Sequence, residues 1–418
     1  MDMVYVFYGL EMKEASRIQA IIEIIEEVFK DLKPADLIID NYLKQRRYIG
    51  SKDRRFITDE VWKIIRNRAK LVAMLENNIT PRLIVGVHFQ DKDLELLFNG
   101  EEYGPDVLSY EEKEKIKKAG VFSNFNIEDM YECPKWLFDK FCDKNLLEAL
   151  NQSAPLDVRA NLTSREKAKD RLRKEGLFFS PTPFSPIGLR SEDRVNLNNS
   201  MTYLDGDIEV MDEASQLIAL LCDTKKHHKI IDYCAGAGGK SLAIGANLQN
   251  EGLIFAHDIS NERLSRIKKR AERLEIRNIK ILSNVEDKDF DRFIIDAPCS
   301  GSGTFRRCPD AKYRLNPKIL DIIVKTQEEI LEFAVKHTKK GGKIIYITCS
   351  VFEEENEKQI ETFLLKHPEF EPLNHKELWS KIIGMEYYPF DSDKYLKFSP
   401  LNTRTDGFFF CSLKKNSD

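Results

Sequence analysis

Several features that mark large classes of proteins are missing from the sequence. Uninterrupted apolar stretches such as Leu217 to Cys222 are far shorter than the roughly 18 residues that a membrane-spanning helix needs. The first residues contain no basic leader and no small-residue cleavage site, so we expect no signal peptide. None of the eight cysteines forms a C-x-x-C pair and none of the seven histidines an H-E-x-x-H, so we expect no bound metal.

The sequence also lacks a strong charge of one sign. Its 65 basic and 69 acidic residues leave a net charge of -4, so a nucleic-acid surface must be a local patch. With 418 residues, of which 42% are hydrophobic and 32% charged, the chain is long enough for two or three domains. This composition is typical of a soluble, reduced, cytoplasmic enzyme. We expect a monomer without a metal or a membrane partner.

Hydrophobic spacing divides the chain into three regions, which we take as domains 1–130, 131–205 and 206–418. The first reads as helical, with helices ending before Pro34 and continuing over 35–43 and 61–75, followed by a loop-like stretch at about 90–130. The second contains short strand-like pieces punctuated by prolines, which predicts a small α+β module. In the third, strands alternate with helices, which predicts a Rossmann-like, doubly wound α/β domain. Its expected strands are 229–232, 253–257, 279–282, 293–296 and 343–349, and its expected helices are 240–248, 261–274 and 317–337.

Basic residues concentrate in two stretches of the chain. Six lie between Lys44 and Arg55 with an aromatic residue among them; a solvated helix face and an RNA-phosphate patch both explain this run. Seven more lie between Arg159 and Lys174, opposed only by Glu166 and Asp170. The second stretch gives the small module a basic face.

A glycine-rich turn, A-G-A-G-G-K-S, follows the first strand of the third region. Such a turn lets the backbone approach a ligand closely, and the N-terminus of the following helix favours polar or anionic groups. The phosphate-loop pattern requires glycine at Cys234, and the dinucleotide pattern requires glycine at Ser241. Each pattern therefore fails by one residue.

Acidic residues end the two strands beside this turn. Asp232 ends the first strand and Asp258 the next, where an acid suits two ribose hydroxyls. S-adenosylmethionine fits these features best, because it carries a ribose and a cationic sulfonium but no phosphate for Lys240 to hold.

Two cysteines come directly after strands of the same sheet. Cys299 lies in D-A-P-C-S-G-S-G and Cys349 in T-C-S, so both fall at the carboxyl edge, where ligands bind in this fold. A lone cysteine there is commonly a small core residue, but two at one edge indicate chemistry. A thiolate that adds to carbon 6 of a pyrimidine makes carbon 5 reactive toward a methyl sulfonium. Asp296 is placed to hydrogen-bond ring nitrogen 3 and absorb the developing charge.

Together these motifs resemble the Fmu/RsmB-like (Sun/nucleolar-protein) family of S-adenosylmethionine-dependent RNA cytosine carbon-5 methyltransferases. The resemblance covers nearly the whole chain. Its blocks are residues 154–161, 211–216, 232–241, 296–310, 348–357 and 406–409.

The resemblance implies roles for individual residues. Cys349 is the attacking thiol, Cys299 assists product release, and Asp296 and Lys240 lie against the target base or the methyl group. Asn284, or Asp287 in its place, stands where many relatives have an aspartate that meets the adenine. The implied cofactor-binding residues are Asp232, Cys234, Ala235, Gly236, Ala237, Gly238, Gly239, Lys240, Asp258, Arg263, Asn284 and Asp296.

The resemblance also implies RNA contacts outside the methyl-transfer centre. Arg159, Asn161 and Arg171 belong to the small module, and the first region is similar in part to NusB-like RNA-binding domains. Arg306 and Arg307 are placed to hold the phosphate beside the target nucleotide, with a structural salt bridge to Asp310 as the alternative.

The expected substrate is ribosomal RNA, with transfer RNA as the alternative. Two other functions are compatible with parts of the sequence. One is a non-catalytic RNA-binding assembly factor. The other is a nucleotide hydrolase that uses Lys240 and Ser241 as a phosphate loop.

Overall fold

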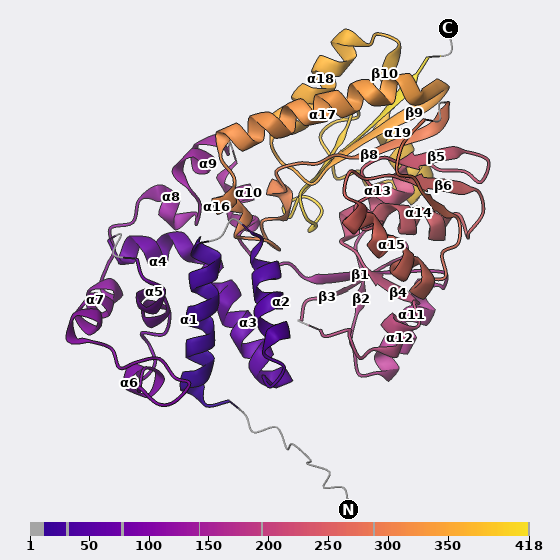
Figure 1. The fold of residues 1–418 in the computed structure, drawn as a ribbon. Coiled ribbons are helices and arrows are strands. Elements are labelled where there is room, and N and C mark those ends of the chain that lie inside the picture. Colours follow the sequence, from indigo (N-terminus) through magenta and orange to yellow (C-terminus); the bar gives the residue numbers. More distant parts are fainter. Residues whose placement is uncertain are drawn as a thin grey trace, which may run out of the picture. The chain divides into compact units, whose positions relative to one another are not determined.

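The computed structural model describes residues 12–30, 33–76, 79–141, 143–193, 195–286 and 289–416. These belong to two compact units, colour-coded by sequence in Figure 1. The helical unit comprises Met1–Asn151 and Arg307–Asn316, and the sheet unit comprises Gln152–Arg306 and Pro317–Asp418. The first residues, where we expect no signal peptide, and Asp287 lie outside the described residues. Within the described ranges, no helix is both long and apolar enough to cross a membrane.

The helical unit packs around one apolar core formed by the inward faces of its longer helices. Ile18, Ile21 and Ile25 of its first helix are fully buried, as their helical spacing predicts. Its helices are α1 (Glu14–Lys30), α2 (Ala35–Gln45), α3 (Ser51–Arg66), α4 (Arg68–Met74), α5 (Pro81–His88), α6 (Leu94–Leu97), α7 (Tyr110–Gly120), α8 (Ile127–Met130), α9 (Lys135–Lys140), α10 (Lys144–Ala149) and α16 (Ala311–Arg314).

Two parts of this unit differ from the sequence prediction. The helix expected over 61–75 is divided at Asn67 into α3 and α4. The stretch expected to be loop-like contains α7, which begins with a capping box between Ser109 and Glu112 and buries Ile116 and Ala119. Its many charged residues lie on the exposed face of a short amphipathic helix, and for this reason the sequence resembles that of a loop.

The segment 307–316 is held in the helical unit by polar contacts. Asp310 accepts a hydrogen bond from the Ala35 backbone N–H at 3.1 Å and pairs with Arg314 at 3.0 Å. The buried Lys312 ammonium donates to the Glu132 carbonyl at 2.6 Å and to Asn151 at 2.7 Å. Burial lowers the pKa of Lys312 to about 8 and raises that of Glu132 to about 7.

The sheet unit begins with a four-stranded antiparallel sheet in the order β2-β3-β1-β4. Its apolar core lies between this sheet and a basic helix, which buries Ala168 and Leu172. The strand-like pieces in the sequence therefore form a small mixed module. Its elements are β1 (Leu156–Ala160), α11 (Arg165–Lys174), β2 (Ser180–Pro181), β3 (Gly188–Ser191), α12 (Met201–Leu204) and β4 (Ile208–Val210).

The larger sheet has eight strands, seven of them in the order β10-β12-β9-β8-β5-β6-β7, with β11 paired to β12. Strands β5 to β9 are parallel, and β10, β11 and β12 are joined by antiparallel pairing. The parallel strands lie where the sequence predicts them, within a few residues. The strands are β5 (Lys229–Asp232), β6 (Leu253–Ala256), β7 (Ile279–Ile281), β8 (Phe290–Asp296), β9 (Thr338–Thr348), β10 (Phe370–Pro372), β11 (Leu396–Phe398) and β12 (Phe408–Lys415).

Helices cover both faces of this sheet (Figure 1), and alternate side chains of each strand enter the two cores. Ile294 packs on the face of α13, α14 and α19, whereas Ile295 packs on the face of α17 and α18. The helices are α13 (Glu213–Leu221), α14 (Gly239–Asn247), α15 (Asn261–Arg273), α17 (Pro317–His337), α18 (Glu357–Lys366) and α19 (His375–Ile383), with short 3-10 turns η1 (Ser302–Thr304) and η2 (Glu353–Glu355).

The chain order reverses between β5 and β8. From β5 the chain proceeds outward through β6 and β7, and then returns to β8 on the other side of β5. The loops at the carboxyl ends of these strands diverge there and leave a crevice in doubly wound folds. The candidate site residues lie at this edge.

Candidate active site

The glycine-rich turn joins the end of β5 to the start of α14. Gly238 has a φ of 82°, and a Cβ at this position would lie 2.8 Å from Ile267, so a larger residue does not fit. A Cβ at Gly236 or Gly239 would meet no atom within 4 Å. The turn therefore presents bare backbone toward open space, which a ligand can approach closely.

Two carboxylates flank this turn. Asp258, after β6, accepts hydrogen bonds from the backbone N–H groups of Gly236 at 2.9 Å and Ser260 at 2.8 Å, and from Arg263 at 2.9 Å. Asp232, at the end of β5, accepts one from the Ser241 hydroxyl at 2.6 Å, whereas its Oδ1 is buried without a partner. Burial raises the pKa of Asp232 to about 7.

These residues fit S-adenosylmethionine. The uncovered glycine backbone leaves room for a ligand, and Oδ2 of the fixed Asp258 carboxylate, which accepts one hydrogen bond, can accept another from a ribose hydroxyl. Of the other residues predicted to bind it, Ala235 is buried and Cys234 packs partly into the core beneath α17. Arg263 orients Asp258, and Asn284 is exposed in the loop after β7.

The two cysteines predicted to be catalytic meet at the ends of β8 and β9. Asp296 pairs with Ile347 in the sheet register, and the Gly303 backbone N–H donates to the Cys349 carbonyl at 3.0 Å. The sulfur atoms of Cys299 and Cys349 are 3.2 Å apart. The hydrogen bond to Cys349 and burial together raise the pKa of the Cys299 thiol well above its usual value. The pair can therefore share a proton, with Cys299 holding it more strongly than a free thiol.

Lys240 and Asp296 form an ion pair beside these cysteines. The Lys240 ammonium lies 2.7 Å from Asp296 Oδ2; the lysine side chain is buried, whereas that of Asp296 is 34% exposed. Burial acts to lower the pKa of Lys240, but the Asp296 carboxylate outweighs it and the pKa is raised. The lysine thus remains charged at the edge of the sheet, and the aspartate still has an accessible side for a ligand.

Glu355, within the block 348–357, is a site residue whose role the sequence does not reveal. Its fully buried carboxylate accepts from the Ser300 backbone N–H at 2.8 Å, the Ser300 hydroxyl at 2.5 Å, the Ser350 hydroxyl and the Gln327 amide at 3.0 Å. Ser300 and Ser350 directly follow Cys299 and Cys349 in the chain. One carboxylate therefore ties together the two loops that carry the cysteines, and α17 supports it.

Asn356 extends this connection to the end of β9. Its side-chain oxygen accepts from the Thr348 hydroxyl at 2.5 Å, and its amide donates to the Ser350 carbonyl at 2.9 Å. The backbone on both sides of Cys349 is thus fixed by neighbouring buried side chains. The signal in the sequence was the acid-amide pair that follows the T-C-S block.

The residues predicted to bind RNA in the four-stranded module are engaged within the protein. Arg159 is fully buried and donates to Asn161 at 3.0 Å, while Asn161 donates to the Leu274 carbonyl at 2.7 Å. Burial lowers the pKa of Arg159 to about 10. Arg171 pairs with Asp205 at 2.7 Å and with Asp207. These placements do not support phosphate contacts by Arg159 and Asn161, and the contact predicted for Arg171 must compete with two carboxylates.

Arg306 also forms its contacts inside the protein. It is buried and pairs with Asp406 and, at 3.6 Å, with Asp212. Arg306 therefore forms a structural salt bridge, which was the alternative to an RNA contact. Its partners are Asp406 and Asp212 and not the expected Asp310. Arg307 is half-buried and belongs to the helical unit.

Solved structures share this fold. PH0851 aligns with 97% of this chain and 100% of its own at a TM-score of 0.76 and 23% identity. NSun6 from Pyrococcus horikoshii, solved with SFG, aligns with 69% of this chain and 100% of its own at a TM-score of 0.61 and 20% identity. The Rossmann-like methyltransferase fold predicted from the sequence is confirmed.

Curated relatives support a narrower assignment. The probable ribosomal RNA small subunit methyltransferase B of Bacillus subtilis is 31% identical over 329 residues, which cover 72% of each chain. The ribosomal RNA small subunit methyltransferase B of Yersinia pseudotuberculosis is 30% identical over 259 residues, covering 58% of this chain and 60% of that protein. The family described as 16S rRNA methyltransferase RsmB/F matches residues 219–414. In agreement with its motifs, the chain belongs to the RsmB/F family of methyltransferases.

Proposed function

We propose that this RNA methyltransferase methylates carbon 5 of a cytosine in RNA through a covalent bond between Cys349 and carbon 6. S-adenosylmethionine is the methyl donor. The observation that carries the proposal is the pair of sulfur atoms 3.2 Å apart, beside the Lys240–Asp296 ion pair at the carboxyl edge of the sheet. A nucleophile, a second thiol and a charged pair are the groups that this chemistry requires.

Each residue has a distinct task in the proposed reaction. The Cys349 thiolate bonds to carbon 6, and the electron pair of the 5,6 double bond moves to carbon 5. Nitrogen 3 of the ring takes a proton from solvent as negative charge develops and returns it on release, and the Asp296 carboxylate, paired with Lys240, accepts a hydrogen bond from that N–H. Carbon 5 then takes the methyl group.

Release of the product breaks the bond between the Cys349 sulfur and carbon 6. The Cys299 thiolate takes the proton from carbon 5, the electrons of that bond re-form the double bond, and the bond between carbon 6 and sulfur breaks. Cys299 gives its own proton to solvent beforehand, while Cys349 is bound to carbon 6, and its raised pKa makes its thiolate a stronger base than a free one. Because the two sulfur atoms are in contact, the newly protonated Cys299 can donate a hydrogen bond to the Cys349 thiolate as that thiolate leaves.

The substrate we propose is small-subunit ribosomal RNA. The relatives from Bacillus and Yersinia carry that substrate in their names, and the matched family is described by 16S rRNA. The target cytosine must be unpaired or flipped, because carbon 6 is inaccessible within a stacked duplex.

Bisulfite sequencing tests both the atom and the substrate. Unmethylated ribosomal RNA and transfer RNA are each incubated with the protein and S-adenosylmethionine, with a Cys349→Ala protein as the control. We expect a new bisulfite-resistant cytosine in small-subunit ribosomal RNA. Methyl incorporation without bisulfite resistance would contradict carbon 5 as the target, and resistance confined to transfer RNA would contradict the proposed substrate.

A further inference from the structure

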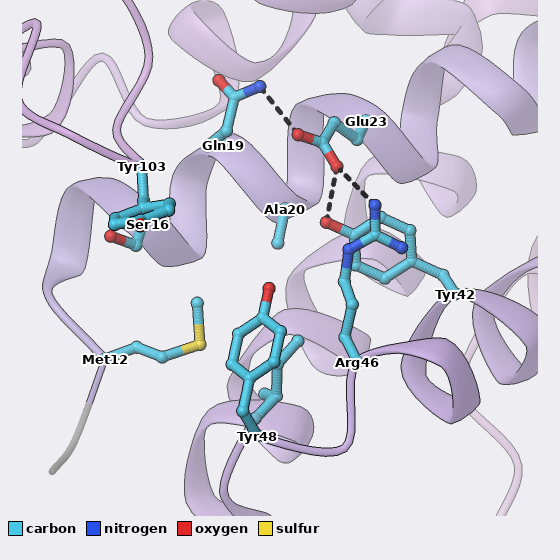
Figure 2. A pocket seen from close by; sticks show the side chains of 10 residues that line it. Met12, Ser16, Gln19, Ala20, Glu23, Tyr42, Arg46, Tyr48 and Tyr103 are labelled. Carbon is cyan, nitrogen blue, oxygen red and sulfur yellow. Dashed lines mark hydrogen bonds and ion pairs between the residues drawn. The ribbon is translucent and has the colours of Figure 1, made fainter.

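A pocket of about 570 Å³ opens in the helical unit. It lies between α1, α2, the turn after α2 and the loop between α6 and α7 (Figure 2). Its volume falls in the range of sites that bind small organic groups. The sequence motifs assigned to methyl transfer lie in the sheet unit and leave this pocket without a role.

Two tyrosines on the pocket are unusually exposed. Tyr48 and Tyr103 each expose 76% of their surface. In Figure 2 the Tyr48 ring stands in the middle of the view, between Met12 and Arg46. Tyr103 has a φ of 67°, which is uncommon for a residue with a side chain. The described residues thus leave most of the surface of both aromatic side chains uncovered.

The opposite wall carries a fixed set of hydrogen-bonding groups. The Glu23 carboxylate accepts from Gln19 at 3.0 Å, from the Tyr42 hydroxyl at 2.7 Å and from Arg46 at 3.2 Å. The Arg46 guanidinium also lies 3.7 Å from the centroid of the Tyr42 ring. These contacts orient donors and acceptors side by side, which suits the polar edge of a planar heterocycle.

The pocket opens at the start of the basic segment 44–55. Arg46 and Tyr48 belong to both, and the exposed Lys44 and Arg47 flank them. Asp53, the acidic residue within the segment, is buried and paired with Arg17 at 2.7 Å. Outside the segment, Lys44 pairs with Asp40 at 3.6 Å and Arg46 with Glu23 at 3.2 Å, whereas the exposed Arg47 can meet a backbone phosphate of a ligand.

We propose that this pocket binds an unpaired nucleobase of the RNA substrate, stacked on the Tyr48 ring with its polar edge toward Gln19 and Arg46. Stacking on an exposed aromatic ring together with basic side chains for the backbone is a common way to bind single-stranded nucleic acid. The proposal rests on an RNA substrate, but not on which carbon receives the methyl group.

A matched pair of variants of the full chain tests the stacking contact. Tyr48→Ala removes one ring of the pocket, whereas Tyr110→Ala removes an equally exposed tyrosine on α7 outside it. Binding of a fluorescent single-stranded RNA is followed by anisotropy. We expect Tyr48→Ala to raise Kd about tenfold, Tyr48→Phe to retain binding, and Tyr110→Ala to change little. Equal Kd values for the Tyr48→Ala and Tyr110→Ala proteins would overturn the proposal.

Photo-cross-linking identifies the occupant directly. Single-stranded RNA containing 4-thiouridine is irradiated with the protein, and the linked peptides are mapped by mass spectrometry. We expect links to peptides containing Tyr48 or Tyr103 that disappear when the complementary strand is annealed. Links confined to other peptides would overturn the proposal. Because this readout involves no methyl transfer, its failure is distinguishable from a failure of the carbon-5 assignment.

Discussion

The carboxyl edge of the eight-stranded sheet and the four-stranded sheet of β1 to β4 use polar residues in different ways. At the carboxyl edge, Asp296 remains partly exposed and Asp232 retains an oxygen without a partner. In the smaller sheet, the arginines that looked available in the sequence are buried or bound to acidic residues of the module. Exposure to a ligand thus distinguishes Asp296 from these arginines, whereas an unpaired polar atom does not, because two buried nitrogens of Arg159 also have no hydrogen-bond partner.

The largest effect we expect from a single change outside the cysteines is that of Glu355→Gln. The amide cannot accept all the hydrogen bonds that hold the two cysteine loops, so their spacing should relax. We expect kcat to fall about 100-fold with a smaller change in KM, as displacements of about 1 Å do in other enzymes. Steady-state kinetics on RNA measures both constants.

A control and a second readout separate loop spacing from loss of folding. Glu353→Gln changes an exposed residue of the same short helix and should leave kcat unchanged. The rate at which a mild thiol oxidant joins Cys299 to Cys349, followed by mass, should fall in Glu355→Gln. An unchanged oxidation rate would show that Glu355 does not fix the spacing of the sulfur atoms.

Asp258→Ala tests the carboxyl edge as a cofactor site. The substitution removes the acceptor that orders Gly236 and Ser260 and that we expect to meet the ribose. Loss of such a buried partner costs about 1–3 kcal/mol, so Kd for S-adenosylmethionine should rise roughly tenfold or more. Calorimetry measures Kd, with Glu262→Ala, an exposed residue of α15, as the control. Unchanged affinity would mean that the cofactor lies elsewhere.

Asp232 should make stability depend on pH. Its pKa is about 7 in the folded protein and near 4 when unfolded, so the folded state binds the extra proton between these values. The stabilisation is complete below pH 4 and is lost as the pH rises toward 7, by about 1.4 kcal/mol per pH unit. Urea unfolding at pH 5 and pH 7 should show this loss in the parent protein relative to Asp232→Asn. Equal losses in both proteins would show that Asp232 titrates normally.

The smallest effect is expected in the four-stranded module. Arg159→Met and Arg171→Gln should leave the salt dependence of RNA binding unchanged, because both arginines are engaged within the protein. Each phosphate contact that a substitution removes lowers the slope of log K against log salt by about one unit. A slope lowered by about one unit in either variant would show that the substituted arginine contacts an RNA phosphate.

The same contrast explains how much could be predicted from the sequence. The parallel strands and the placement of both cysteines followed from local patterns, because residues after neighbouring parallel strands meet at one edge. The burial of Arg159 and the pairing of Arg306 with Asp406 depend on residues distant in the chain. The role of Glu355 likewise depends on distant residues, since its partners come from two loops and from α17. A basic residue in a sequence does not disclose whether a carboxylate already holds it.

The most direct test of the account is to trap the covalent intermediate. The proposed roles predict that Cys299→Ala still attacks and methylates once, and then remains attached to its RNA. A denaturing gel should show a slowly migrating protein–RNA band that requires S-adenosylmethionine and disappears with RNase, whereas Cys349→Ala should give no band and no methylation. A band from Cys349→Ala in place of Cys299→Ala would contradict the roles assigned to the two cysteines, and methylation by the double variant would contradict the covalent mechanism itself.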